Sequence, residues 1–444
     1  MLSAAYRRYV LVVMTAVYTL NLVDRTLISL FLQSIKDDLH LSDSELGLVT
    51  GIAFGLFYAA FGIPFGRWAD RGNRVTLTSI AIGLWGLTVM ACQLVINFGQ
   101  LVGARIAGGI GEAGSRPPTY SLLGDYFPDP IERTRAMSIY FAGGPLSGLV
   151  GYFVGGWLGA THGWRGTFFI MGIPGLVLAV LVKATIAEPR VHGATAQSHE
   201  PVIPPVRAVL STLWTHRALR HLSLALISLF IMSMGLTPWF AAFMVRSHHI
   251  ATAELGIWFG TIFGLGGLAG ALTGGYAATH WFPKNERAQM RMAAVSIAAL
   301  TPCYVAFLTL PQQGLALLSL VPLVFVGNIF QGPAYTLMQR LVSDETRATT
   351  MAVVLFLMNL VGYAVGPQLV GFLSDALLPV AGTDSLRYAM LATSSVTLWS
   401  AFHFWKAGDA APADLAAMGR APAPTASASG YPQGPTLSRV QQQL

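Results

Sequence analysis

The chain has 444 residues, of which 54% are hydrophobic and only 11% are charged, with a formal net charge of +7. Soluble domains carry about 25% charged residues, so the composition excludes a soluble globular protein and indicates an integral membrane protein. The excess of Lys and Arg does not indicate a nucleic-acid partner, because these residues lie in short stretches between apolar segments rather than in one basic stripe.

Hydropathy predicts twelve membrane spans of the usual ~20-residue length, and hence an all-α membrane protein. The spans cover residues 9–35, 45–67, 74–96, 98–124, 134–160, 164–187, 221–245, 254–279, 288–310, 314–338, 347–374 and 385–406. With the N-terminus in the cytoplasm, the loops on the opposite side hold only Lys36, Arg165, Arg246 and Arg387 among the bases. The positive-inside rule therefore places both termini in the cytoplasm, and we expect a monomer in a bacterial inner membrane.

Composition shifts divide the chain into four parts. Residues 1–187 and 221–406 form two six-helix bundles, and residues 188–220 form a cytoplasmic linker between them. The linker segment VRAVLSTLWTHRALRHL has bases on one side and apolar residues on the other, which predicts a helix along the membrane surface, either a passive tether or a sensor. Residues 407–444 are rich in Ala, Pro, Ser and Gln and are predicted to be a disordered cytoplasmic tail.

An internal repeat relates the two bundles. SELGLVTGIAFGLFYAAFGIPFGRWAD from Ser44 aligns without gaps to AELGIWFGTIFGLGGLAGALTGGYAAT from Ala253. LVGYFVGGWL from Leu149 recurs as LVGYAVGPQL from Leu360. Two blocks at nearly one offset predict two pseudo-symmetric halves, as in transporters whose binding site lies between the repeats.

Ionisable residues occur inside two of the apolar spans, both in the first half. They are Asp24 and Arg25 in the first span, and Arg105, Glu112 and Arg116 in the fourth. A charge at the middle of a bilayer costs about 3 kcal/mol or more on insertion scales, so such residues usually line a polar cavity or pair with one another. The pattern predicts a proton- or ion-linked transport pathway.

Helix geometry indicates how these charges are arranged. With a rise of ~1.5 Å per residue, Asp24 and Arg105 lie at similar depth in antiparallel spans, which allows an ion pair between them. Arg105, Glu112 and Arg116 share one helical face, which is expected to line the central cavity. Gly108 and Gly109 are expected to leave open space between these charges.

The acids are candidate proton carriers, with Glu112 the first choice and Asp24 the second. Other interpretations remain open. Asp24 could form a structural ion pair with Arg25, and Glu112 and Arg116, four residues apart, could form a static salt bridge.

Three motifs resemble the major facilitator superfamily. GRWADRGNR, from Gly66 to Arg74, resembles the loop between its second and third helices. Arg105 with IAGGIGEA resembles the fourth-helix motif, and GGPLSGLVGYFVGG from Gly143 resembles the fifth-helix antiporter motif. The resemblance covers essentially the whole membrane region and implies a twelve-helix major facilitator fold with two pseudo-symmetric six-helix bundles.

Two shorter motifs are similar to those of the spinster group, which comprises sphingolipid and lysolipid transporters. They are NLVDR, from Asn21 to Arg25, and GIGEA, from Gly109 to Ala113. Two features depart from the pattern: Arg116 lies outside both motifs, and the second-half counterpart of the loop motif, GGYAATH, has lost its acid and arginines.

The resemblance implies a cytoplasmic gate formed by Asp70, which would hold that side closed in the outward-open state. The other members of this predicted gate are Arg71, Arg74 and Arg135. A simpler interpretation is that the arginines only satisfy the positive-inside rule.

In the fifth span, a predicted hinge provides close packing and a kink about which the halves can rock. Its residues are Gly144, Pro145 and Gly148.

The predicted substrate cavity is charged on one wall and apolar on the other, because the second-half spans contribute aromatic and uncharged polar residues. Its residues are Asn21, Arg25, Arg105, Arg116, Trp239, Phe243, Asn328, Gln331 and Asn359. This arrangement suits an amphipathic solute, with its head group at the arginines and its tail against the second half.

The sequence therefore predicts a secondary active transporter that moves sphingolipid- or lysophospholipid-like amphiphiles by alternating access coupled to protons. A proton-coupled exporter of drugs or organic ions is the alternative if the substrate is cationic. Outside transport, a membrane receptor or lipid-modifying enzyme is a further alternative. The sequence has no metal-ligand cluster, nucleophile–base pair or phosphate loop, so we predict no enzyme activity, metal or cofactor.

Overall fold

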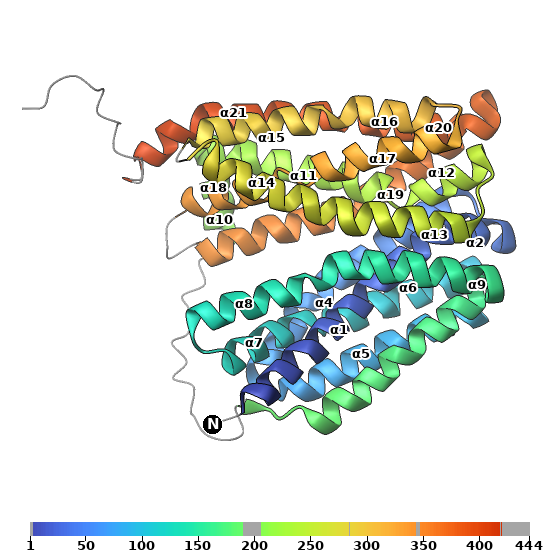
Figure 1. The fold of residues 1–444 in the computed structure, drawn as a ribbon, viewed down its shortest axis with the longest axis horizontal. Coiled ribbons are helices and arrows are strands. Elements are labelled where there is room, and N and C mark those ends of the chain that lie inside the picture. The colour runs from blue at the N-terminus through green and yellow to red at the C-terminus, as the bar shows by residue number, and fades with distance from the viewer. Residues whose placement is uncertain (1–2, 190–205, 284, 343–346, 418, 420–444) are drawn as a thin grey trace, which may run out of the picture.

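The computed structural model describes residues 3–189, 206–283, 285–342, 347–417 and 419, and these residues contain helices and no strands (Figure 1). The first half of the chain forms α1 (Ala4–Leu30), α2 (Leu32–Leu39), α3 (Asp43–Thr50), α4 (Ile52–Arg71), α5 (Arg74–Ala91), η1 (Cys92–Leu94), α6 (Phe98–Ala113), α7 (Arg116–Tyr126), α8 (Pro130–Phe141) and α9 (Gly143–Thr185).

The second half begins with the linker helix α10 (Val206–Thr215). It continues with α11 (Arg217–Leu236), α12 (Trp239–His248), α13 (Thr252–Thr261), the π-helical turn η3 (Ile262–Gly266), α14 (Gly267–His280), α15 (Glu286–Ala298), α16 (Leu300–Thr309), α17 (Gln313–Gly327), α18 (Gln331–Arg340), α19 (Arg347–Ala381), η4 (Gly382–Asp384), α20 (Ser385–Ser394) and α21 (Val396–Ala417).

These helices make twelve crossings from one end of the molecule to the other. Nine described stretches are long and apolar enough to span a membrane, and two of them, with 55 and 65 residues, cross twice. The first of the two reverses at Gly163 (φ 65°) and the second at Gly382 (φ 54°), a left-handed conformation that glycine adopts without steric cost. The charged pair α6–α7 makes the remaining crossing. The predicted all-α, twelve-span architecture is confirmed.

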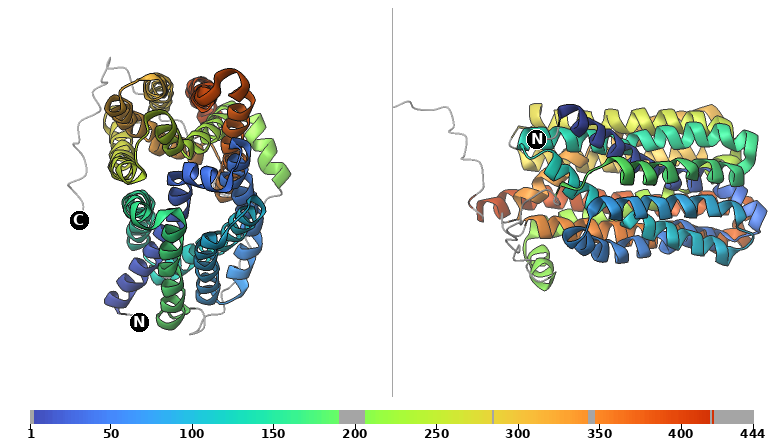
Figure 2. Two further views of the ribbon diagram at one scale, coloured as in Figure 1. Left: turned by 90° about the vertical axis from the view of Figure 1, so that its right-hand side faces the viewer. Right: turned by 90° about the horizontal axis from the view of Figure 1, so that it is seen from below.

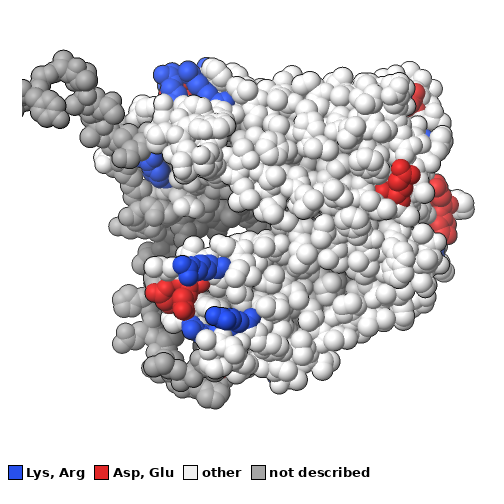
Figure 3. Space-filling view, viewed as in Figure 1, with Lys and Arg blue, Asp and Glu red and all other residues white. Residues whose placement is uncertain are grey.

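The crossings form two bundles that meet along one long interface. Figure 2 shows the helices of the first half, in blue and green, grouped apart from the yellow and red helices of the second half. Helix α1 begins and α21 ends at the same end of the molecule, which we call the terminal end; the opposite end is the distal end (Figure 1). On the face in Figure 3, a broad band without Lys, Arg, Asp or Glu separates the two ends, as expected of a body that spans a bilayer.

The repeated sequence blocks form the contact between the bundles. Helices α3 and α4 pack against α19, where a methyl group added to Gly47 would lie 2.7 Å from the carbonyl oxygen of Pro367. In the second half, α13 packs against α9, where a methyl group added to Gly256 would lie 2.9 Å from the Cα atom of Gly156. The glycines of the repeat therefore permit the backbones of the two halves to approach closely, as small residues do in other membrane bundles.

Two of the predicted boundaries between the bundles, the linker and the tail differ from the structure. Helix α11 begins at Arg217 rather than 221, and α21 continues to Ala417 rather than ending at 406. The extension is stable because Leu415 is fully buried and Asp414 accepts a hydrogen bond (2.7 Å) from the backbone N–H of Ala218 at the start of α11. The remainder of the predicted tail, apart from Gly419, lies outside the described residues, as do residues 190–205 of the linker.

Because the backbones of the two halves approach closely at Gly256, we expect Gly256→Val to prevent this approach and to separate the distal ends of the bundles. Gly275→Val in α14 is the matched control, since a methyl group there meets no atom within 4 Å. Nitroxide labels on the exposed distal residues Ile96 and Gln312, in a protein with Cys92 and Cys303 replaced by Ala, report the distance. A Gly256→Val protein with wild-type distances would contradict this account of the interface.

Candidate functional site

A cavity of about 500 Å³ lies between the two halves at the centre of the molecule. Its charged groups come from the first half, where Arg25 on α1 and Arg105 on α6 line the wall. The second half contributes uncharged polar groups and an apolar surface: Asn328, Gln331, Tyr363, Met234, Phe263, Leu268 and Val324. The structure therefore has a cavity with one cationic wall and one largely apolar wall.

Glu112 lies behind this cationic wall, between two arginines. Its carboxylate is fully buried and accepts hydrogen bonds from Arg25 Nη2 (2.7 Å) and Arg25 Nε (3.3 Å). Arg116 Nη2 donates to the same Oε1 atom (2.9 Å), so one carboxylate serves two guanidinium groups. The Glu112–Arg116 bridge considered from the sequence is present, and Arg25 completes a three-residue cluster.

Asp24 forms a separate pair with Arg105. Arg105 Nη1 donates to Asp24 Oδ2 (2.5 Å), and the exposed fractions of the two side chains are only 3% and 2%. The pair joins α1 to α6, at the matched depth that the sequence predicted. Within the described residues, the second carboxylate oxygen, Oδ1, has no hydrogen-bond partner. The alternative pairing of Asp24 with Arg25 is not the arrangement in this structure.

Aromatic rings surround the arginines and replace part of their hydration. The Arg25 guanidinium lies 4.6 Å from the ring centre of Phe54, 5.3 Å from that of Tyr58 and 4.7 Å from that of Tyr363. Arg105 lies 4.8 Å from the ring centre of Phe54. Such cation–π contacts contribute more when the cation is desolvated, as it is here.

Several residues predicted for the cavity lie elsewhere. Trp239 and Phe243 are completely buried inside the second half. Helix α11 ends at Leu236, and the residues that follow it, Thr237 and Pro238, line the cavity instead. Asn21 is buried and donates to the Ser115 hydroxyl (2.5 Å).

Two further predicted residues also lie away from the cavity wall. Arg116 bonds to Glu112 and is only 20% exposed. Asn359 is half-buried and donates to the carbonyl oxygen of Leu355 on its own helix (2.7 Å). Neither lines the cavity, whereas Arg25, Arg105, Asn328 and Gln331 do.

The prediction that Gly108 and Gly109 leave open space is wrong for Gly109, whereas a methyl group added to Gly108 would make only an ordinary contact, 3.6 Å from the Thr88 hydroxyl. A methyl group added to Gly109 would lie 2.7 Å from the carbonyl oxygen of Phe54, and one added to Gly111 would lie 2.9 Å from the backbone nitrogen of Trp85. These glycines allow α6 to pack closely against α4 and α5, which holds the charged face of α6 in position.

The residues of the predicted gate at the terminal end have different environments. Asp70 and Arg71 are exposed at the end of α4, and Arg135 is exposed on α8. Arg74 is instead completely buried: its Nε donates to Glu188 (3.0 Å) and its Nη1 forms an ion pair with Asp125 (2.6 Å).

These contacts join Arg74 to Asp125 of the first half and to Glu188, the first residue of the linker. The Arg74 side chain fastens the start of α5 to α7 and to the residues that follow α9, so it has a structural role in this state.

The predicted hinge residues Gly144, Pro145 and Gly148 line the cavity, directly after a helix break at Ala142.

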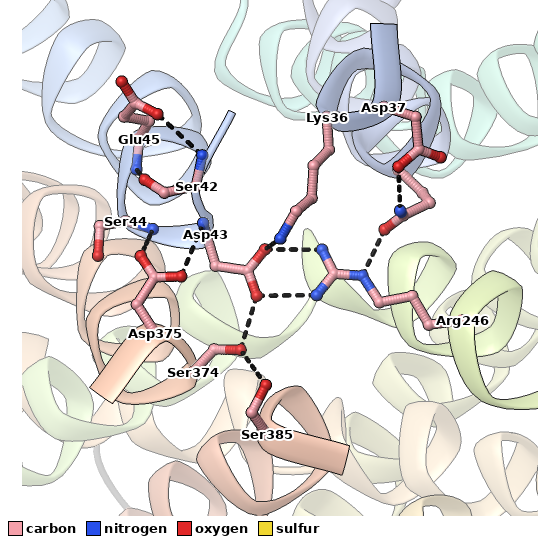
Figure 4. Close-up of polar contacts among 11 residues, drawn as sticks. Lys36, Asp37, Ser42, Asp43, Ser44, Glu45, Arg246, Ser374, Asp375 and Ser385 are labelled. Carbon is pink, nitrogen blue, oxygen red and sulfur yellow. Dashed lines mark hydrogen bonds and ion pairs between the residues drawn. The ribbon is translucent and has the colours of Figure 1, made fainter. Parts of the chain in front are cut away.

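A charged cluster at the distal end was not predicted from the sequence. It comprises Lys36, Asp43, Arg246, Ser374 and Asp375, and we call it the distal gate (Figure 4). Asp43 is buried at the start of α3 and accepts two hydrogen bonds from Arg246 of α12, at 2.7 and 2.8 Å. Lys36 Nζ (2.6 Å) and the Ser374 hydroxyl (2.6 Å) also donate to its carboxylate.

Asp375 strengthens the distal gate through the backbone of α3. Its two carboxylate oxygens accept hydrogen bonds from the N–H groups of Asp43 (3.1 Å) and Ser44 (2.7 Å). A carboxylate is stabilised there because the first N–H groups of a helix have no partner within the helix. Helix α3 begins at this position because Ser42 and Glu45 form a capping box.

The distal gate is therefore held by contacts from α12 and α19 of the second half onto α3 of the first. The sequence contained one signal of this cluster, since Lys36 and Arg246 are among the few bases on their side of the membrane. Elsewhere, no group of three His, Cys, Asp or Glu side chains in the described part of the chain could hold a metal ion.

Two six-helix bundles around a central cavity are the architecture of a membrane transporter. The family model of the Major Facilitator Superfamily matches residues 14–367, and the chain belongs to this superfamily. Within the superfamily, it resembles the spinster group.

Three comparisons illustrate these relationships. An MFS-type efflux pump of Mycolicibacterium smegmatis is 32% identical, over 89% of this chain and 91% of the pump. A sphingosine-1-phosphate transporter of Danio rerio is 25% identical, over 84% and 78% of the two chains. The crystal structure of a bacterial homologue of the human lysosomal transporter spinster, in an inward-facing and unoccupied conformation, has a TM-score of 0.81 at 27% identity and covers 93% of this chain and 99% of its own.

Removing Asp24 would leave Arg105 as an unpaired charge in a buried site, which typically costs 3–5 kcal/mol. We therefore expect Asp24→Asn to lower the thermal unfolding temperature of the purified protein substantially. Glu132→Gln is the control, because its pair with Arg7 is 48% and 27% exposed and such surface pairs contribute little. Equal unfolding temperatures for wild type and Asp24→Asn would show that the pair does not stabilise this state.

Arg246 supplies two of the hydrogen bonds that cross the distal gate, so we expect Arg246→Ala to weaken closure and to lengthen the Ile96–Gln312 label distance. Arg387→Ala is the matched control, because Arg387 is also distal but pairs with Asp384, three residues away in its own half. If both variants keep the wild-type distance distribution, Arg246 does not hold the gate closed.

Proposed function

We propose that this transporter moves lipid-like amphiphiles, of the sphingolipid or lysophospholipid type, by alternating access coupled to protons. The observation that carries the proposal is the composition of the cavity walls. Arg25 lines one wall and binds the buried carboxylate of Glu112 behind it, and the opposite wall is largely apolar.

The charges favour an anionic or zwitterionic head group. Asp24 and Glu112 compensate two of the three arginines Arg25, Arg105 and Arg116, which leaves one positive charge at the cavity wall. Guanidinium groups bind phosphate oxygens through paired hydrogen bonds, so a phosphate-bearing head group matches this wall.

A proton on Glu112 would change the binding properties of the wall. When Glu112 is ionised, it occupies nitrogens of both Arg25 and Arg116. When it is protonated, the donors of Arg25, which lines the cavity, become available to the head group of the substrate. We infer that proton binding and anionic head-group binding support each other at Glu112. Asp24 is the second candidate carrier, but its single partner Arg105 is itself almost completely buried.

The apolar wall suits the tail of such a substrate. Met234, Phe263, Leu268 and Val324 lie on the second-half side of the cavity, and Asn328 and Gln331 are its uncharged polar groups. A sphingosine-1-phosphate transporter among the relatives agrees with a substrate that has a phosphate head and an apolar tail.

We place the terminal end in the cytoplasm and the distal end on the opposite side of a bacterial inner membrane, because the bases of the sequence concentrate in the loops of the terminal end. The closed distal gate then corresponds to an inward-facing state, in agreement with the inward-facing spinster homologue to which the fold is similar. One chain supplies both walls of the cavity, so we propose that the protein works as a monomer. Gating by Asp70, Arg71 and Arg135, and hinge motion at Gly144, Pro145 and Gly148, remain predictions.

A second candidate function is the export of cationic drugs or organic ions. The efflux pump of M. smegmatis, at 32% identity, favours it. In that case a cation would compete with the proton for Glu112, and protons and substrate would move in opposite directions.

The test is flux in proteoliposomes with an imposed pH gradient, using a labelled lysophospholipid, sphingosine-1-phosphate and a cationic dye. We expect lipid flux that follows the pH gradient and is abolished by Glu112→Gln. Glu254→Gln should retain it, because Glu254 is exposed on α13 and accepts a hydrogen bond from Gln313. Gradient-driven dye flux without lipid flux would favour the exporter, and full lipid flux in Glu112→Gln would remove Glu112 from the mechanism.

A further inference from the structure

A column of regularly spaced residues connects the central cavity to the distal gate. On the first half it consists of positions four residues apart along α3 and α4: Asp43, Gly47, Gly51 and Gly55. On the second half it consists of positions with the same spacing along α19: Tyr363, Pro367, Gly371 and Asp375. The two sets run in opposite directions and face each other.

Contacts are continuous along this column. Gly55 and Gly51 lie against Tyr363, Gly47 lies against Pro367, and the backbone of Asp43 lies against Gly371. Beyond Gly371, Asp375 bonds to the start of α3. Close backbone packing leaves little room for one end of such a column to move without the other. A displacement of α19 at Tyr363 would therefore be transmitted to the gate.

Tyr363 is the point where this column meets the charged cluster. Its hydroxyl accepts a hydrogen bond from Arg25 Nη1, and its ring centre lies 4.7 Å from the Arg25 guanidinium. The other two nitrogens of Arg25 bond to Glu112. Arg25 therefore joins a carboxylate of the first half to a hydroxyl of the second half with one rigid, planar group.

Neutralising Glu112 would alter this arrangement. Arg25 and Arg116 now share Glu112 Oε1, and without its negative charge the two guanidinium groups would repel each other at close range. The remaining partners of Arg25 are the Tyr363 hydroxyl and the rings of Phe54, Tyr58 and Tyr363. The titratable and charged groups around Glu112 are Tyr18 and Arg25 of α1, Tyr58 of α4, Arg116 of α7 and Tyr363 of α19. The Asp24–Arg105 pair lies beside them, because Arg105 and Arg25 contact the same ring of Phe54.

We propose that Tyr363 is a positioning residue that transmits the protonation state of Glu112, through Arg25, to the distal gate. The inference rests on the proton coupling of the proposed function, but not on the identity of the substrate. Protonation of Glu112 shifts Arg25 relative to Tyr363, and α19 carries this shift along the column to Asp375.

The sequence repeat provides a matched control for the Tyr363 hydroxyl. Tyr152 is the counterpart of Tyr363 in the other repeated block, and it also lines the cavity. Its ring packs against Phe259 and Phe263 across the interface, at centroid distances of 5.4 and 5.7 Å. Its hydroxyl faces Ser29 rather than a charged group. Removing this hydroxyl should therefore leave the response to pH unchanged.

The experiment measures the Ile96–Gln312 label distance from acidic to neutral pH, without substrate, in wild type and in Tyr363→Phe and Tyr152→Phe. We expect the wild-type distance distribution to change with pH, and Tyr152→Phe to follow it. In Tyr363→Phe the ring is kept but the hydroxyl is lost, and the response should fall several-fold. A wild-type pH profile in Tyr363→Phe would overturn the proposal.

A second pair of variants keeps the test valid if Tyr363→Phe does not fold. A methyl group on Gly55 would collide with Cβ of Tyr363 and displace its ring from Arg25, whereas one on Gly62 of the same helix meets no atom within 4 Å. Gly55→Ala should therefore lose the pH response and Gly62→Ala should retain it; equal responses in the two would overturn the proposal.

Glu112→Gln distinguishes a failure of proton coupling at Glu112 from a failure of the role proposed for Tyr363. If it loses the pH response while Tyr363→Phe keeps it, proton coupling stands and the role of Tyr363 is wrong. If Glu112→Gln keeps the wild-type response, the proton role of Glu112 and the inference that rests on it both fail.

Discussion

The need to compensate charges in a poorly solvated interior organises the centre of this transporter. Three arginines and two acids lie where water is scarce, and all of them belong to α1, α6 and α7. They form one pair and one cluster of three, and aromatic rings cover the faces of the guanidinium groups. The chain does not neutralise them completely, and the remaining positive charge faces the cavity through Arg25. The same constraint therefore stabilises the first half and sets the charge of the cavity wall.

The second organising feature is the very close approach of the two halves. Glycines at matching places in both repeats allow α3 and α4 to lie on α19, and α13 to lie on α9. Small residues of this kind allow helix backbones to approach closely. The charges then act where the surfaces meet: Arg25 at the cavity, and Asp43 with Asp375 at the distal gate.

Much of this arrangement could be predicted from the sequence, for identifiable reasons. Twelve spans follow from hydropathy, and the Asp24–Arg105 pair follows from depth because both residues lie on long, regular helices. Cavity-facing residues in the second half were harder to predict. Trp239 lies directly after the break at Thr237–Pro238, which changes the direction that each following side chain faces.

The distal gate could not be derived from the sequence, because it joins Asp43, Arg246 and Asp375 from three distant segments that have no pattern in common. Arg74 shows a related difficulty. Its place in a family motif indicated a gate, yet its neighbours Glu188 and Asp125 are brought to it only by the packing of α7 and α9.

The burial of the distal gate has a consequence for how the transporter responds to its surroundings. Dissolved salt screens the interactions of solvent-exposed charges, with a Debye length of about 8 Å at physiological ionic strength, but it weakens buried pairs much less. Asp43 is only 3% exposed and Arg246 only 16%, whereas the terminal-end pair of Arg287 and Asp409 is 52% and 31% exposed. Closure of the distal end should therefore be insulated from changes in salinity, whereas exposed pairs such as Arg287–Asp409 remain subject to the ionic strength of the solution around them.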